Sequence, residues 1–150
     1  MYKNTFTHYL TKILVDIMFF LGIPCVLTVF WWMQLFTSYL AYNPAYVRLL
    51  SIILLLSGAA LVYILWQIKK MLATLVGGNP FVEKNITCLR KCAVASFLIA
   101  LIFLAKEIIV FTIASGLLVI VFGFLGLFCL TLKDLFKQAV AYKQENDWTV

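Results

Sequence analysis

Charged residues are scarce in this sequence, and so are the residue types that build catalytic centres. Only 12% of the 150 residues are charged, six of them are acidic, and there is a single histidine, His8. These residues supply no His/Asp/Ser or Cys/His arrangement and no paired carboxylates. No glycine-rich loop leads from a strand into a helix. The sequence therefore predicts a protein that is not an enzyme and needs no cofactor.

Cysteine is also sparse. Each of the four cysteines falls inside an apolar run or on the side expected to face the reducing cytoplasm, so structural disulfides are not expected. Cys88 and Cys92 lie four residues apart, a spacing that presents two thiolates on one helix face. A zinc site needs about four ligands, however, and His8 is the only histidine. We therefore predict no metal site.

Long apolar runs are what the sequence does contain. Its hydrophobic fraction is 65% and its mean hydropathy is +1.05, which leaves too little polar surface to coat a water-soluble globule. A bilayer core of about 30 Å needs roughly 20 apolar residues per helix. Four runs meet that length, at about 13–36, 47–68, 93–109 and 113–132. They predict an all-α, four-helix transmembrane bundle that forms one domain over 1–150. The first run is too long for a signal-peptide core, so we expect it to be retained.

Lysine and arginine are distributed unevenly over the connections between these runs. Arg48 and Lys106 fall on one side, and ten cations fall on the other: Lys3, Lys12, Lys69, Lys70, Lys84, Arg90, Lys91, Lys133, Lys137 and Lys143. The positive-inside rule then places both termini, the 69–92 loop and the 133–150 tail in the cytoplasm of a bacterial cell, with the spans in the inner membrane. Cations at span ends are typical of contact with anionic lipid headgroups, so the net charge of +6 does not indicate direct nucleic-acid binding.

Two spans are expected to continue as helices into the cytoplasm. The second should run to Val76, where Gly77 and Gly78 supply a left-handed cap. Asn79 is then expected to be the N-cap of the next helix, with Pro80 at its first position. After the fourth span, helical spacing of apolar residues predicts an amphipathic extension along the inner leaflet or the base of the bundle, with an acidic tail that can dock onto Lys84, Arg90 and Lys91 or onto a partner.

Few ionisable residues lie within or beside the spans. Asp16 has Lys12 four residues before it, which favours an ion pair on one helix face. Lys106 and Glu107 are adjacent and are expected not to pair with each other. Glu107 can instead meet Arg48, or the charged groups can simply extend to the membrane interface. We interpret Asp16, Glu107 and Arg48 mainly as structural ties. A proton or cation site at Asp16, or a contact of Glu107 with an external ligand, stays open.

The sequence resembles the bacterial membrane proteins catalogued as domain of unknown function family 2975. The resemblance covers essentially the whole length, and it lies in the connection between the second and third spans and in the closing 145–150 segment. The matching positions are Asn79, Pro80, Phe81, Asn85, Leu89, Arg90, Asn146 and Asp147. The resemblance implies a four-helix membrane protein without established activity, frequently encoded beside a small helix-turn-helix regulator.

These observations lead to two functional hypotheses. In the first, the cytoplasmic face, including the eight matching positions, binds a partner protein, plausibly a helix-turn-helix regulator that it senses or sequesters at the membrane. In the second, the chain is a small permease, efflux or immunity-type protein that acts on a membrane-active compound. Membrane lipids are expected partners in both, and association with further copies of the chain stays open.

Overall fold

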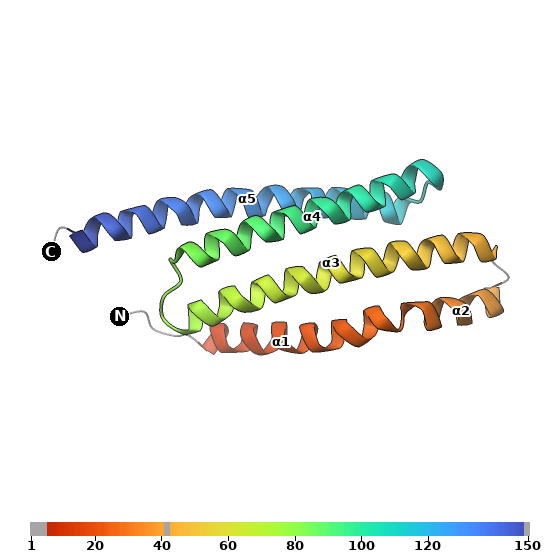
Figure 1. Ribbon diagram of the computed structural model, residues 1–150, viewed down its shortest axis with the longest axis horizontal. Helices are drawn as coiled ribbons and strands as arrows, with labels where there is room; N and C mark the ends of the chain where they lie inside the picture. Colours follow the sequence, from red (N-terminus) through yellow and green to blue (C-terminus); the bar gives the residue numbers. More distant parts are fainter. Residues whose placement is uncertain (1–5, 41–42, 149–150) are drawn as a thin grey trace.

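A computed structural model describes residues 6–40 and 43–148; of Phe36, residues 38–40, Asp147 and Trp148 it describes the backbone alone. All regular secondary structure in these ranges is helical (Figure 1). The helices are α1 (Phe6–Leu27), α2 (Val29–Leu40), α3 (Pro44–Val76), α4 (Glu83–Ile109) and α5 (Ile113–Trp148). The predicted all-α fold is confirmed.

Four of the helices, α1, α3, α4 and α5, are long and apolar enough to cross a membrane. The chain is therefore a multi-pass membrane protein. Helix α3 has 33 residues and α5 has 36, which corresponds to roughly 50 Å at about 1.5 Å per residue. The hydrocarbon core of a bilayer is only about 30 Å thick, so both helices extend beyond it.

The two ends of the molecule contain different segments of the chain. One end, here called the loop end, contains the 77–82 connection, the start of α1 and the C-terminal part of α5 (Figure 1). The opposite end, here called the turn end, contains the 110–112 connection between α4 and α5. Two predicted helix boundaries are confirmed: α3 ends at Val76, and the last two spans separate between Ile109 and Ile113.

The first predicted span is not one continuous helix. The helix breaks at Thr28, between α1 and α2. The break lies one turn after Pro24, which has no N–H to donate to the Phe20 carbonyl and so weakens the helix in this region. The Thr28 hydroxyl adds to the bend by donating to the carbonyls of Pro24 at 2.8 Å and Cys25 at 3.3 Å. A proline followed four residues later by a threonine was the sequence signal for this kink.

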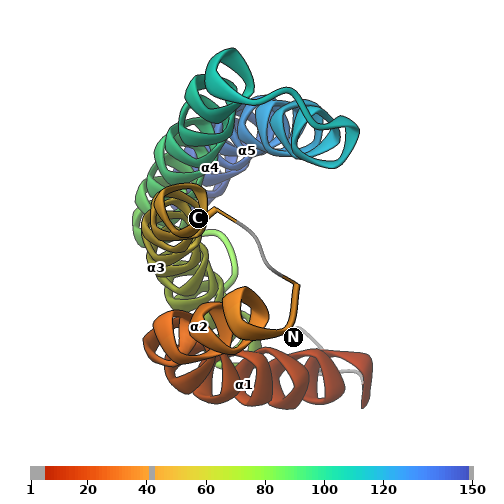
Figure 2. The ribbon, with the colours of Figure 1, turned by 90° about the vertical axis from the view of Figure 1, so that its right-hand side faces the viewer.

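The long helices form an open arc rather than a closed ring (Figure 2). Along the arc, α1 packs against α3, α3 against α4, and α4 against α5. Among the described residues, no Cα atom of α1 comes within 8 Å of one in α5. The core lies where α3, α4 and α5 meet, and its buried members are Ile53, Ile64, Cys92, Ala93, Ala95, Ile99, Phe103 and Cys129.

Two glycines set the close approach of α1 and α3. A Cβ atom added to Gly58 would lie 2.8 Å from Val26 Cγ2, and one added to Gly22 would lie 3.3 Å from Val62 Cγ2. A valine side chain of the opposite helix thus packs against each glycine. Small residues of this kind let membrane helices pack closely, where van der Waals contact replaces the hydrophobic effect as the driving force.

Candidate functional site

The loop end begins with a well-formed helix cap. Gly78 has a φ of 79°, and its N–H donates to the Leu75 carbonyl at 3.1 Å. The N–H of Asn79 donates to the Thr74 carbonyl, also at 3.1 Å. This pair of bonds is a Schellman motif, in which a glycine adopts the left-handed conformation that other residues resist. The predicted left-handed cap is confirmed.

The predicted start of the next helix was wrong. Helix α4 begins at Glu83, and its N-cap is Val82, which makes no side-chain capping bond. Asn79 lies four residues before Glu83, and its Oδ1 atom accepts a hydrogen bond from Lys143 Nζ at 2.6 Å. The Pro80 carbonyl is also engaged, since it accepts from the Val82 N–H at 3.2 Å. Residues 79–82 therefore form a connection before α4 and not its first turn.

Asn85 joins the three segments of this connection. Its Nδ2 atom donates to the Pro80 carbonyl at 2.6 Å and to Thr74 Oγ1 at 2.7 Å. Only 2% of Asn85 is exposed, and Leu89, one turn later, is 5% exposed. Both side chains therefore make their contacts within the protein itself. Asn85 fixes the loop between the end of α3 and the start of α4.

Aromatic contact fixes α5 to the same connection. The rings of Phe81 and Phe136 lie 5.6 Å apart between centroids, and Val140, one turn further along α5, is buried. The helical extension of the fourth span is confirmed, because α5 is unbroken to Trp148. It runs on past the start of α4 (Figure 1). The predicted docking of the tail onto Lys84, Arg90 and Lys91 involves Asp147, whose side chain lies outside the described residues, and it stays a prediction.

The eight predicted partner-binding positions therefore separate into groups. Asn79, Pro80 and Phe81 form the connection that holds α5, and Asn85 and Leu89 are buried beneath it. Arg90 and Asn146 are exposed, on α4 and α5 respectively. The Asp147 side chain lies outside the described residues. The sequence had not singled out Thr74 or Lys143, which complete the hydrogen bonds of the connection.

Asp16 pairs with a different lysine from the one predicted. Its Oδ1 atom lies 3.0 Å from Lys69 Nζ on α3, and the two side chains are about one-third exposed. The ammonium group also lies over the rings of Phe19 and Phe20, at 5.3 and 4.9 Å from their centroids. Because α1 and α3 pack antiparallel, Asp16 and Lys69 lie at the same level. The two aromatic rings add a cation–π attraction for Lys69 that Lys12, the predicted partner, would lack. The pair is a tie between helices.

A second polar cluster lies at the turn end. Lys106 is only 5% exposed, and its Nζ atom donates to Thr112 Oγ1 at 2.6 Å and to Ser115 Oγ at 2.7 Å. Glu107 Oε1 lies 3.5 Å from the same Nζ atom. Glu107 also accepts hydrogen bonds from the Ser115 hydroxyl and from the Thr112 N–H, the latter at 3.1 Å to Oε2.

Two predictions about this cluster were therefore wrong. Lys106 and Glu107 do pair, because the tight turn after α4 brings Thr112 and Ser115 over both side chains. The predicted contact of Glu107 with Arg48 is absent from the described residues. Arg48 instead lines a groove between α2 and α3, together with Met33 and Ser51.

Replacing Lys106 with methionine is expected to lower the thermal midpoint of the detergent-solubilised chain. The change removes the ammonium that compensates the Glu107 carboxylate and the two hydroxyls. A double variant, Lys106→Met with Glu107→Gln, is expected to recover part of the loss because no uncompensated carboxylate remains. A double variant less stable than Lys106→Met alone would contradict this account.

The cysteines form no disulfide among the described residues. Cys88, Cys92 and Cys129 are buried as free thiols, and Cys25 is exposed on α1. In residues 6–40 and 43–148, no group of three or more His, Cys, Asp or Glu residues is placed to hold a metal ion. The buried thiols act as small apolar residues of the core.

Comparison with known proteins gives one match. A family model described as "Protein of unknown function (DUF2975)" matches residues 3–150. No curated protein and no solved structure matches the chain. The match covers almost the whole length, including every contact described at the loop end and the turn end, and the chain is therefore a member of the DUF2975 family.

Proposed function

We propose that this chain is a non-enzymatic protein of the bacterial cytoplasmic membrane whose loop end lies in the cytoplasm and binds a helix-turn-helix regulator. The charge distribution supports this orientation. Nine described cations belong to the segments of the loop end, and only Arg48 and Lys106 belong to the turn end. The positive-inside rule favours the cytoplasm for the end with more cations.

The observation that carries the proposal is a groove between the first turns of α4 and the extension of α5. It has a volume of about 360 Å³. Its apolar members are Ile86, Val140 and Ala141, and its polar members are Glu83, Thr87, Lys137 and Gln144. A mixed lining of this kind suits the amphipathic helix of a protein partner, which buries apolar anchors and pairs its polar edge.

The groove is also rigidly held. One wall is α5, which the Asn79–Lys143 hydrogen bond and the Phe81–Phe136 contact fix against the connection. A preorganised surface costs less conformational entropy on binding than a flexible tail does. The family resemblance supports a helix-turn-helix regulator as the partner, since it implies that such regulators are frequently encoded beside these membrane proteins.

Replacing Ala141 with glutamate is expected to weaken regulator binding by about tenfold or more, because the longer, charged side chain occupies part of the groove and loses hydration when a partner enters. The matched control is Tyr142→Glu, which adds the same charge at the next residue, 69% exposed and outside the groove. Binding is measured by co-purification of the regulator with the tagged full chain from native membranes. The proposal fails if no regulator is retained by the wild type, or if both variants bind equally.

A second function, that of a small permease, efflux or immunity-type protein, has one supporting observation. A groove of about 580 Å³ lies between α1, α3, α4 and α5, and most of its lining is apolar, including Leu21, Leu61 and Phe122. Such a groove suits a membrane-active compound. Under this function, a strain that lacks the chain should become sensitive to such compounds. The wild-type chain should restore resistance to that strain, whereas chains with Asp16 or Glu107 replaced should not. Indifference of the deletion strain to a broad panel would exclude it.

A further inference from the structure

A further groove, between α3 and α4, combines a basic rim with an apolar floor. Its volume is about 490 Å³. The floor consists of Ala60, Val94, Ala95 and Leu98, and Tyr63 lies beside it. The rim, one to two turns closer to the loop end, holds Thr87, Arg90 and Lys91.

Among the side chains that the structure describes, neither rim cation forms an ion pair with a carboxylate. The described ion pairs are those of Lys69 with Asp16, Lys106 with Glu107, and Lys133 with Asp134. Arg90 and Lys91 are exposed and belong to none of these pairs. The groove therefore has an uncompensated double positive charge at one edge, which an anionic group of a ligand would complement.

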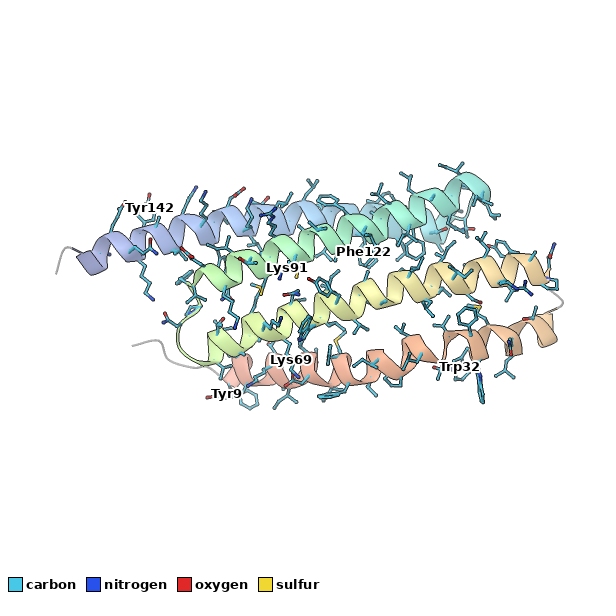
Figure 3. All side chains as sticks on the ribbon, viewed as in Figure 1. Tyr9, Trp32, Lys69, Lys91, Phe122 and Tyr142 are labelled. Atoms are coloured by element: carbon cyan, nitrogen blue, oxygen red, sulfur yellow. The ribbon has the colours of Figure 1, made fainter. Side chains whose placement is uncertain are left out.

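The rim lies at the level expected for a membrane interface. Tyr63 and Trp66 make an edge-to-face contact, with ring centroids 6.0 Å apart, and Lys70 Nζ lies 3.5 Å from the Trp66 centroid. Tyrosine, tryptophan and lysine are enriched where the hydrocarbon core meets the headgroups. Lys69 and Lys91 also lie at a similar level along the long axis (Figure 3). The floor of the groove then faces hydrocarbon and its rim faces headgroups.

We propose that this groove binds one anionic phospholipid from the leaflet at the loop end. The phosphate accepts hydrogen bonds from the Arg90 guanidinium and the Lys91 ammonium, and one acyl chain lies along Ala60, Val94 and Leu98. A free phosphate ion would use only the rim. A zwitterionic lipid would bring a cationic headgroup beside Arg90 and Lys91. The combination of rim and floor therefore selects a lipid that carries net negative charge.

The test uses the full chain in nanodiscs made from equal parts of phosphatidylglycerol and phosphatidylcholine. Native mass spectrometry after release into detergent counts the retained lipids. We expect the wild type to retain phosphatidylglycerol preferentially. The variant Arg90→Gln/Lys91→Gln should lose this preference by roughly thirtyfold, because each cation near an anionic lipid contributes about a factor of five. Both positions are exposed, so the helical fold should be unchanged by circular dichroism.

Two further variants separate this site from general charge attraction. Lys84→Gln/Lys133→Gln removes the same charge from the same end outside the groove, and it should keep the preference. Val94→Trp fills the floor at a residue that is 61% exposed, and it should reduce retention of the lipid while leaving the rim charges in place. An equal loss in Lys84→Gln/Lys133→Gln, no loss in Val94→Trp, or complete displacement of the lipid by inorganic phosphate would overturn the proposal.

Discussion

Replacing Gly58 with leucine is expected to separate α1 from α3. Even the Cβ atom would lie 2.8 Å from Val26 Cγ2, and a β-branched valine in a helix has little freedom to move away. Overpacking of this kind costs about 1–3 kcal/mol. Because α1 packs mainly against α3 and does not approach α4 or α5, the effect should be local. Amide hydrogen exchange should accelerate in α1 much more than in α4.

The matched control for this prediction is Gly123→Leu. Gly123 also lies within a helix, but a Cβ atom there meets nothing within 4 Å. Leucine is a better helix former than glycine, so this variant should be neutral or slightly stabilising. A compensating change, Val26→Ala in the Gly58→Leu background, should restore part of the protection of α1. Equal exchange in the two leucine variants would contradict the packing account.

Replacing Asn85 with alanine is expected to destabilise the loop end by about 2–3 kcal/mol. The variant removes the donor at 2.6 Å from the Pro80 carbonyl, which keeps only the Val82 N–H at 3.2 Å, and it also removes the contact with Thr74. Because Asn85 is buried, water does not readily replace these bonds. The connection at 77–82 should become sensitive to limited proteolysis, and the thermal midpoint of the detergent-solubilised chain should fall.

Asn79→Ala is the control for Asn85→Ala. It also removes one asparagine from the connection, but the hydrogen bond it removes, to Lys143, is exposed. We expect a loss of about 1 kcal/mol or less. If Asn79→Ala destabilised the chain as much as Asn85→Ala, burial would not be what makes Asn85 important.

The contacts at the loop end also change how the family-matching positions are understood. Asn79, Phe81, Asn85 and Leu89 are all engaged within the chain, in holding α5 and the start of α4 together. Their primary role is therefore structural. Two surfaces that remain available at this end are the groove beside Ala141 and the groove beside Arg90, and we propose a protein partner for the first and a lipid for the second.

The sequence by itself determined the membrane class, the number of spans, the end of α3 and the boundary between the last two spans. These features are local: a backbone in lipid must satisfy its own hydrogen bonds, so an apolar run of sufficient length becomes a helix. A glycine pair at the right position likewise ends α3 without help from distant residues. Pro24, which weakens any helix that contains it, was the sequence signal for the break one turn later at Thr28.

Only the tertiary structure decided which polar side chains meet. Asp16 lies against Lys69, and Lys143 reaches Asn79, a residue 64 positions away in the sequence. Sequence spacing describes neighbours on one helix, whereas these pairs depend on which faces of antiparallel helices come together. The open arc has the same origin, since apolar faces in a bilayer can be covered by lipid as readily as by another helix, and the packing of side chains such as Val26 on Gly58 selects the contacts that form.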